Sequence, residues 1–166
     1  VPCTSLNQNR YVFPRQSIYS IKFYLYLLII LFFIFRTSIL SAQTHGAEYR
    51  TIDSYLYGRF ETSIKSSQGD GFLSSFFTFY DSADPWGEID IELLGLYDHT
   101  VDLNIITTGQ ASHIRQHYIP FNPHLEFHDY GFEWTPEYVA WFINGEEIYR
   151  QSGAHITEMD SAQKIM

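Results

Sequence analysis

Three acidic residues at alternate positions are the strongest chemical signal in the sequence. Glu88, Asp90 and Glu92 stand in the segment Trp-Gly-Glu-Ile-Asp-Ile-Glu, in which isoleucines separate the acids. Alternate residues of a β-strand project from one face, so we expect the three carboxyl groups to share a face while Ile89 and Ile91 enter a core. At ~3.3 Å per residue, the Cα atoms of Glu88 and Glu92 would lie roughly 13 Å apart.

Two glutamates that lean towards each other across such a gap are suited to glycoside hydrolysis. Carboxyl separations of ~5–5.5 Å are typical of retaining glycosidases, and ~6.5–9.5 Å of inverting ones. Three acids this close cannot all ionise cheaply, so their pKa values must spread. One glutamate could then remain a proton donor while another is a carboxylate nucleophile. The alternative interpretation is a solvated strand face, on which alternating acids are ordinary.

Aromatic residues near the acids favour the catalytic interpretation. Trp86 lies two positions before Glu88 on the same predicted face, and Phe77 and Phe79 alternate on a nearby predicted strand. Carboxylates for bond cleavage and flat rings for stacking are what a pyranose ring needs. A carbohydrate substrate is therefore expected.

Composition indicates a globular chain of about one domain. The 166 residues are 45% hydrophobic, 17% charged and 18% aromatic. Residues 1–43 contain basic residues and no acid, whereas residues 44–166 contain all 19 acidic residues and no cysteine. A body this acidic is a poor phosphate binder, so we expect no nucleic-acid partner. The missing cysteine suits an oxidising exterior.

Residues 1–43 are predicted to be an upstream segment followed by an export signal. Phe23 to Phe35 is an unbroken apolar run, flanked by Lys22 and Arg36 and followed by the small residues Ser41-Ala42. This order is typical of a secretory signal peptide, whereas a spanning helix needs ~20 apolar residues. We expect secretion to the extracellular space or periplasm, with no stable membrane association after cleavage. An uncleaved membrane anchor is the alternative.

Residues 44–166 are predicted to form an all-β domain. Short aromatic or β-branched runs alternate with turn signals, and no period of 3.6 persists over a helix length. Asn144-Gly145 is the favoured pair for a two-residue hairpin turn. Residues 113–123 lack a clear pattern and are expected to be a loop. Regularly spaced short strands indicate an antiparallel β-sandwich or barrel. The predicted strands are Tyr55–Lys65, Gly71–Tyr80, Gly87–Leu94, Thr100–Thr107, His128–Trp134, Tyr138–Ile143 and Glu147–Gln151.

The acidic segment and its surroundings resemble the lichenase branch of glycoside hydrolase family 16. The acids have the family's E-x-D-x-E form, and other matching segments follow in the family's order. They are Gly46–Arg50, Tyr57–Lys65, Ser74–Phe79, Asn104–Gly109, Phe127–Pro136 and Trp141–Gly145. The resemblance implies a concanavalin A-like jelly-roll sandwich that cleaves mixed-linkage β-1,3-1,4-glucan internally with retention of configuration. Action on laminarin or xyloglucan, and a carbohydrate-binding sandwich without turnover, are the alternatives.

The resemblance also implies roles for individual residues. Glu88 matches the nucleophile, Glu92 the general acid/base, and Asp90 the helper between them. Phe79 stands where the family more often has Tyr, and Asp102 where it commonly has Gln. The positions that match substrate-binding residues are Trp86, Phe77, Phe79, Glu61, Asn104 and Asp102.

No cofactor is expected for this chemistry. The family often carries a structural calcium ion, but its ligands cannot be placed on this sequence, so no metal ligand is assigned. His113 and His117 are four residues apart, yet Pro120 and the lack of a helical pattern favour loop histidines. We expect a monomer whose partner is a β-glucan polysaccharide.

The order of the matching segments resembles circularly permuted members of the family. Gly46–Arg50 directly follows the predicted signal peptide, whereas in ordinary members the corresponding segment comes after several strands. The last residues, Ala162–Met166, resemble the start of a strand that continues in the family. We therefore expect a permuted enzyme of which this chain is a part, with residues 44–166 forming an incomplete sandwich.

Overall fold

The computed structural model describes residues 23–29, 46–80 and 86–166. The chain divides into two units, Val1–Gly46 and Ala47–Met166. Residues 23–29 of the first unit are helical. Within the described ranges, no helix combines the length and the apolar character that crossing a bilayer requires. The remainder of the predicted signal peptide, including its expected end at residues 41–42, lies outside the described residues.

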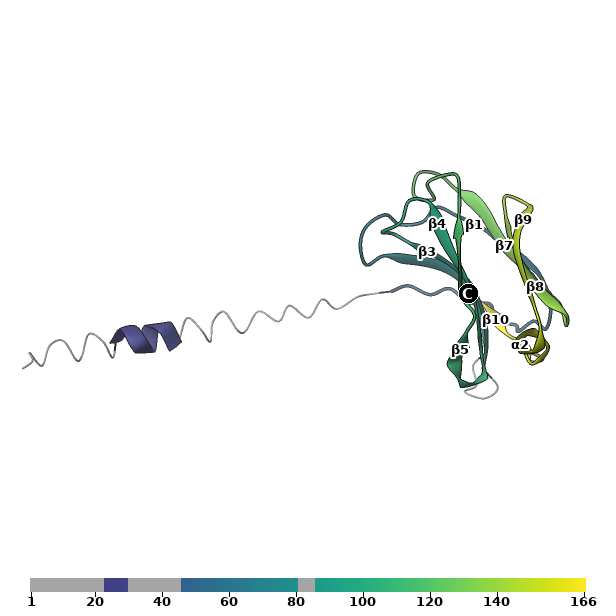
Figure 1. The fold of residues 1–166 in the computed structure, drawn as a ribbon, viewed down its shortest axis with the longest axis horizontal. Coiled ribbons are helices and arrows are strands. Elements are labelled where there is room, and N and C mark those ends of the chain that lie inside the picture. The colour runs from purple at the N-terminus through teal and green to yellow at the C-terminus, as the bar shows by residue number, and fades with distance from the viewer. Residues whose placement is uncertain (1–22, 30–45, 81–85) are drawn as a thin grey trace, which may run out of the picture. The chain divides into compact units, whose positions relative to one another are not determined.

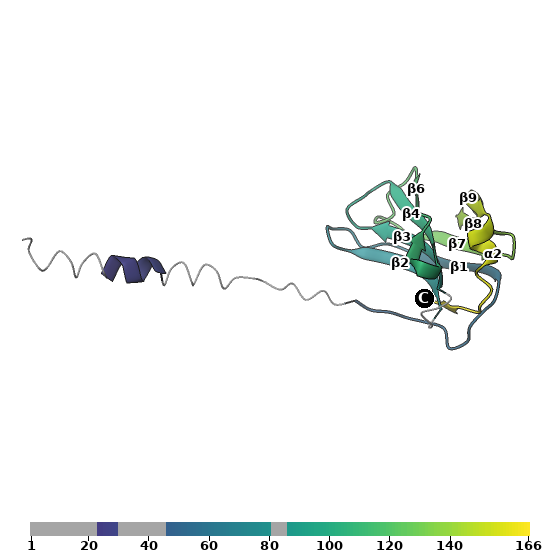
Figure 2. The ribbon, with the colours of Figure 1, turned by 60° about the horizontal axis from the view of Figure 1, so that its bottom comes forward.

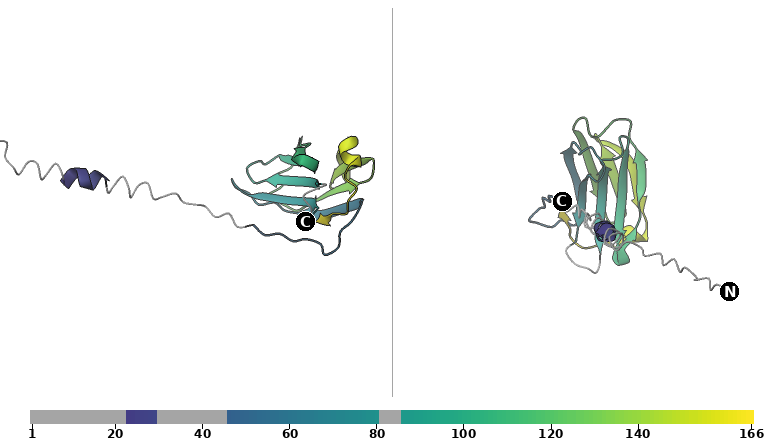
Figure 3. Two further views of the ribbon diagram at one scale, coloured as in Figure 1. Left: turned by 90° about the horizontal axis from the view of Figure 1, so that it is seen from below. Right: turned by 90° about the vertical axis from the view of Figure 1, so that its left-hand side faces the viewer.

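The second unit is built from two antiparallel sheets packed face to face (Figure 1). One sheet has four strands in the order β1-β7-β8-β9. The other has six, in the order β10-β2-β3-β4-β5 with β6 also paired to β4. Figures 2 and 3 show the two layers from other directions. The elements are β1 (Gly58–Ile64), β2 (Leu73–Phe79), β3 (Gly87–Leu94), β4 (Thr100–Thr107), the 3₁₀ turn η1 (Thr108–Gln110), β5 (Ala111–Ser112), β6 (Arg115–Tyr118), β7 (His128–Trp134), β8 (Tyr138–Ile143), β9 (Glu146–Ser152), α2 (Ala154–Thr157) and β10 (Lys164–Ile165).

All seven predicted strands are confirmed. The bounds of β3, β4, β7 and β8 agree with the prediction, and those of β1, β2 and β9 differ by a few residues. The β8–β9 turn has a φ of 52° at Asn144 and 84° at Gly145, as predicted. The loop predicted for residues 113–123 is wrong in part, because β6 pairs with β4 there. Its residues are mostly exposed, so no apolar alternation marks the strand.

Apolar side chains from both sheets fill the space between them. On β3, Ile89, Ile91 and Leu93 are almost completely buried, as the alternation predicts. Burying one such side chain contributes about 1.5–3 kcal/mol. The core anchors the inner face of β3 and so directs the intervening acids out of the sandwich. The largest side chains that the other sheet adds to this core are Tyr130, Phe132, Trp134 and Trp141.

A buried hydrogen bond joins the two sheets beneath the acids. Trp141 Nε1 on β8 donates to the backbone oxygen of Asp90 on β3 at 3.0 Å. An unpaired indole N–H at this depth would cost about 1–3 kcal/mol, so the bond favours one placement of β3 over β8. The position of the acidic strand is thereby coupled to the core.

Candidate active site

The outward-facing side of β3 brings the three predicted acids together. Glu88, Asp90 and Glu92 alternate with the buried residues and share one face. Asp90 is only 4% exposed, whereas Glu88 and Glu92 are partly exposed. The strand register puts side chains of β2 and β4 on the same face. We call this surface the acid face and define it as Glu88, Asp90, Glu92, Phe77, Phe79, Asp102 and Asn104.

Glu88 accepts hydrogen bonds from both of its neighbours on the face. Trp86 Nε1 donates to Glu88 Oε2 at 3.1 Å, and the Asp90 carboxyl is hydrogen-bonded to Glu88 as well. Burial raises the pKa of Glu88, while the bonds from Trp86 and Asp90 oppose that rise. The Trp86 ring also meets Phe79 edge-on, with centroids 5.2 Å apart. Both donors favour the ionised form of Glu88.

The surroundings of Asp90 favour its protonated form. Burial, together with the charges of Glu88 and Glu92, raises the pKa of Asp90 to about 8. A protonated carboxyl has one O–H to donate, and Glu88 lies within hydrogen-bond reach. Asp90 therefore donates to the Glu88 carboxylate.

Asn104 supports Asp90 from β4. It stands opposite Asp90 in the register and hydrogen-bonds the Asp90 carboxyl. Its Oδ1 accepts from Ser112 Oγ at 2.9 Å and from the His113 backbone N–H at 3.0 Å. The amide NH₂ of Asn104 is therefore left to face Asp90. No sequence pattern indicates Ser112, because its contact with Asn104 depends on the short β5 strand folding back along β4.

Glu92 has a different environment from Glu88. Asp102 stands directly opposite on β4, and Gln116 Nε2 donates to Asp102 Oδ1 at 3.0 Å. Burial first, then the charges of Asp102 and Glu88, raise the pKa of Glu92. Within the described ranges no side chain donates a hydrogen bond to Glu92. The two glutamates thus differ, because donors favour the anion of Glu88 and only Glu92 has Asp102 opposite it.

The predicted substrate-binding residue Glu61 does not lie on the acid face. β1 belongs to the four-stranded sheet, where Glu61 stands opposite Gly131. The adjacent Phe60 packs on Phe132 in the core, so Glu61 projects from the opposite side of the sandwich. There Arg59 Nη2 forms an ion pair with Glu61 Oε1 at 2.8 Å. The prediction is corrected on this point, because long-range pairing with β7 placed the strand in the other sheet.

The other predicted substrate-binding residues do adjoin the acids. Phe79 stands opposite Glu88 and Phe77 opposite Asp90 on β2. Both rings are partly buried, so they offer apolar surface beside the carboxyl groups. Asp102 and Asn104 border the acids on the β4 side. The arrangement combines rings on one side with polar groups on the other.

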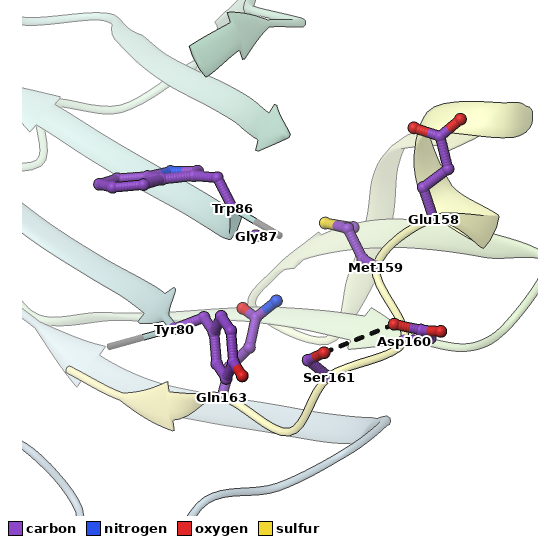
Figure 4. Close-up of a pocket in the computed structure, with 8 residues that line it drawn as sticks. All are labelled: Tyr80, Trp86, Gly87, Glu158, Met159, Asp160, Ser161 and Gln163. Carbon is purple, nitrogen blue, oxygen red and sulfur yellow. Dashed lines mark hydrogen bonds between the residues drawn. The ribbon is translucent and has the colours of Figure 1, made fainter. Parts of the chain in front are cut away.

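A shallow hollow adjoins Trp86 and the Gly87 end of β3 (Figure 4). Tyr80, Trp86, Asp160 and Gln163 are among its lining residues. Gln163 Oε1 is buried there without a hydrogen-bond partner among the described residues. A Cβ at Gly87 would collide with the Gln163 side chain, so the glycine makes room for it. The hollow and the neighbourhood of Glu88 share the Trp86 side chain.

A buried serine–histidine pair has the spacing of a hydrolytic triad, but it lacks the exposure to solvent that a substrate would need to reach it. Ser66 Oγ lies 2.8 Å from His124 Nδ1, and Asp98 Oδ1 lies 3.8 Å from His124 Nε2. Ser66 is only 3% exposed and His124 6%, so a substrate cannot reach the hydroxyl. The pair links the segments that follow β1 and precede β7, which makes it structural.

Metal ligation finds no support in the described part of the chain. No group of three or more His, Cys, Asp or Glu side chains there is arranged to hold an ion, so no carboxylate set fits the implied calcium. His113 stacks on His155, with ring centroids 4.1 Å apart. His117 lies on β6 opposite Val101. The calcium ion stays a prediction.

Comparison with known proteins identifies the family. Residues 33–166 match the family model of glycosyl hydrolases family 16. The chain belongs to glycosyl hydrolase family 16. A xylanase/beta-glucanase of Ruminococcus flavefaciens is 43% identical over 107 residues, which are 63% of this family 16 chain and 13% of that protein. A beta-glucanase of Fibrobacter succinogenes is 32% identical over 137 residues, 78% of this chain and 39% of that protein.

Solved structures of two glucanases are similar in fold to this chain. A prokaryotic beta-1,3-1,4-glucanase (lichenase) derived from a mouse hindgut metagenome matches with a TM-score of 0.65 and 35% identity, over 77% of this chain and 61% of that one. The beta-glucanase of Bacillus licheniformis matches with a TM-score of 0.63 and 31% identity, over 70% and 54%. The predicted jelly-roll sandwich is confirmed. The chain spans less than two thirds of the length of each of these proteins.

Proposed function

We propose that this chain carries the catalytic face of a secreted endo-β-glucanase that cleaves mixed-linkage β-1,3-1,4-glucan with retention of configuration. The observation that carries the proposal is the difference between two glutamates on one strand. Glu88 accepts hydrogen bonds from Trp86 and Asp90, whereas Glu92 stands opposite the acid Asp102. The relatives named beta-glucanase and lichenase support the substrate class.

In the first step, Glu88 attacks the anomeric carbon and Glu92 acts as general acid. A bond forms between a Glu88 carboxylate oxygen and the anomeric carbon while the glycosidic C–O bond breaks. The proton of Glu92 passes to the departing oxygen, which leaves as a sugar hydroxyl. Trp86 and Asp90 orient the attacking carboxylate through their hydrogen bonds.

In the second step, Glu92 acts as general base. It takes a proton from water, the water oxygen attacks the anomeric carbon, and the bond to Glu88 breaks to regenerate the carboxylate. Two inversions at the same carbon give net retention. Carboxyl groups supply both proton transfers and the covalent step, so the proposal includes no cofactor.

The surroundings of the acids support a sugar substrate. The partly buried rings of Phe77, Phe79 and Trp86 offer faces on which a pyranose can stack. Asn104 and Asp102 offer polar groups on the β4 side. Secretion and a monomeric state remain part of the proposal, with the apolar run of residues 23–35 as the support for export.

The proposal is tested by oligosaccharide release from mixed-linkage β-glucan. The full chain is compared with Glu88→Gln and with Glu61→Gln, which removes the same charge from the opposite side of the sandwich. We expect short mixed-linkage products from the wild type and Glu61→Gln, and a loss on the order of a thousandfold or more in Glu88→Gln. Equal release by Glu88→Gln would contradict the nucleophile.

Two other outcomes would change the proposed substrate or class. Release from laminarin or xyloglucan, but not from mixed-linkage glucan, would replace the substrate. A folded wild type that binds β-glucan without releasing sugar would support a carbohydrate-binding sandwich instead of an enzyme.

A further inference from the structure

The acid face holds a fourth carboxyl group that the two-step mechanism does not use. Asp102 on β4 stands directly opposite Glu92 on β3. Cβ atoms of directly opposed residues in an antiparallel pair lie about 4.5–5.5 Å apart, and like charges there repel. The Asp102–Glu92 pair is therefore costly when both groups are ionised.

Gln116 holds Asp102 in place without neutralising it. It stands opposite Asp102 on β6, and its Nε2 donates to Asp102 Oδ1 at 3.0 Å. A carboxylate accepts such a bond in its ionised form. A Lys or Arg at position 116 would have cancelled the charge of Asp102, and the amide does not. The bond thus orients the Asp102 carboxyl group on the acid face.

No positive charge among the described residues offsets Asp102 near Glu92. On β2, the residue opposite Glu92 is the uncharged Ser75. On β3, the nearest titratable neighbours are Asp90 and Glu88. On β6, Arg115 is paired with the core residue Leu103.

The two basic residues of β6, Arg115 and His117, lie on the side of the strand that faces away from Glu92. The Arg115 guanidinium lies 5.8 Å from the ring centroid of Tyr149 on the other sheet. His117 is paired with the core residue Val101. Within the described part of the chain, the charged groups that face Glu92 are therefore acids, and the Asp102 charge adds to burial in raising the pKa of Glu92.

We propose that Asp102, oriented by Gln116, is a positioning residue that keeps Glu92 protonated as the general acid and so sets the alkaline limit of hydrolysis. The inference rests on the proposed function, in which Glu92 must carry a proton when the glycosidic bond breaks. The same repulsion serves the second step, because a Glu92 carboxylate facing Asp102 takes a proton from water more readily. Asp102 touches neither bond that is made or broken.

The test measures the titration of Glu92 and the pH profile of hydrolysis in parallel. The full chain, labelled with ¹³C in the glutamate carboxyl groups, is titrated by NMR, and the Glu92 signal is assigned with Glu92→Gln. Wild type is compared with Asp102→Asn, with Asp102→Gln as a second neutral variant, and with Asp129→Asn as a control. Asp129 is an exposed aspartate on β7, so its variant removes the same charge from the other sheet.

We expect both Asp102 variants to lower the Glu92 titration midpoint by roughly half to one pH unit, as expected for one charge at this separation in a partly solvated site. The alkaline limb of the kcat/KM profile should move to lower pH by the same amount. Asp129→Asn should change neither quantity.

An unchanged Glu92 midpoint in both Asp102 variants would overturn the inference. A raised KM with an unmoved alkaline limb would overturn it as well, since Asp102 would then be a sugar ligand. If the Glu92 midpoint falls in the Asp102 variants but the wild type cleaves no glucan, the coupling of Asp102 to Glu92 stands and the proposed function is overturned. The two failures are therefore distinguishable.

Discussion

The acid face of the six-stranded sheet and the outward side of the four-stranded sheet are both rich in carboxyl groups and aromatic rings. On the four-stranded sheet, the carboxylates have cations beside them. Arg150 binds both carboxylate oxygens of Glu147, at 2.9 and 2.6 Å, and Arg59 pairs with Glu61. The same arginines stack on rings, since the Arg150 guanidinium lies 3.6 Å from the ring centroid of Tyr138. On the acid face, carboxyl groups meet one another instead.

The difference shows what makes a carboxyl group reactive. The hydrogen bonds from Arg150 lower the pKa of Glu147, so this exposed carboxylate remains ionised. Burial and neighbouring acids raise the pKa values of Asp90 and Glu92. Two protonation states can therefore coexist on one strand at neutral pH, which acid/base catalysis requires. The four-stranded sheet has the same residue types without that property.

The largest expected effect comes from substituting a glutamate on the acid face, and a glutamate on the four-stranded sheet is substituted as the control. Glu92→Gln removes the proton donor and should lower hydrolysis of β-glucan by roughly 10²–10⁴-fold. A substrate with a good leaving group needs little protonation, so its cleavage should fall much less. Glu133→Gln on β7, measured in the same assay, should retain activity. Equal losses in both variants would contradict the assignment of the acid face as the active site.

A smaller effect is expected from the donor to Glu88. Trp86→Phe keeps a ring beside Phe79 but removes the indole N–H. Hydrogen bonds to charged groups are worth about 1.5–3 kcal/mol, so kcat should fall roughly 10–100-fold. The acidic limb of the pH profile should move to higher pH, because the pKa of Glu88 rises when the Trp86 bond is lost. An acidic limb that does not move would show that Trp86 only stacks on sugar.

The third prediction concerns stability rather than turnover. The folded-state pKa of Asp90 is about 8, against an ordinary value of 3.8, so the folded chain binds this proton more tightly than the unfolded chain. Its contribution to the free energy of unfolding is therefore present at low pH and is lost as pH rises from about 4 to about 8. Asp90→Asn should flatten this decline in urea denaturation experiments.

Glu147 should show the opposite pH dependence of stability in the same urea denaturation experiments. Its pKa is lowered in the folded state, so its contribution is present above its ordinary pKa and is lost as pH falls through the folded value. Glu147→Gln should therefore alter stability at neutral pH and not in acid. Identical pH dependence in the Asp90 and Glu147 variants would contradict the contrast between the two faces.

The smallest effect is expected for Arg59→Ala. Arg59 pairs with Glu61 and lies 3.9 Å from the ring centroid of Phe142, but exposed ion pairs contribute little to stability. Hydrolysis should stay within about twofold of wild type, and thermal denaturation should show a slight decrease in Tm. A large loss of activity would indicate that this side of the sandwich takes part in catalysis.

The sequence predicted the acidic strand well because its information is local. Alternation of Ile89, Ile91 and Leu93 with the acids defines both faces of β3 without knowledge of its partners. The Asn144-Gly145 turn was predicted for the same reason, since its conformation depends on the two residues themselves. The first and last residues of β3, β4, β7 and β8 could thus be predicted from sequence alone.

Sheet membership and polar edge strands could not be predicted in this way. The alternation in β1 separates Glu61 from Phe60 but does not say which sheet receives the strand, because the partner β7 is about 70 residues away. β6 was missed because an exposed edge strand needs no apolar face. Gln116, which holds Asp102, lies on that missed strand, so its role became visible only in the folded chain.

The most direct test of the central claim is rescue of two alanine variants by azide. A β-glycoside with a good leaving group is supplied to Glu88→Ala and to Glu92→Ala with sodium azide, and the anomer of the glycosyl azide is determined by NMR. Azide should replace the missing carboxylate in Glu88→Ala and give the α-azide by a single inversion. In Glu92→Ala it should attack the glycosyl-enzyme and give the β-azide. The reverse assignment of anomers, or no azide product from Glu88→Ala, would contradict Glu88 as the nucleophile.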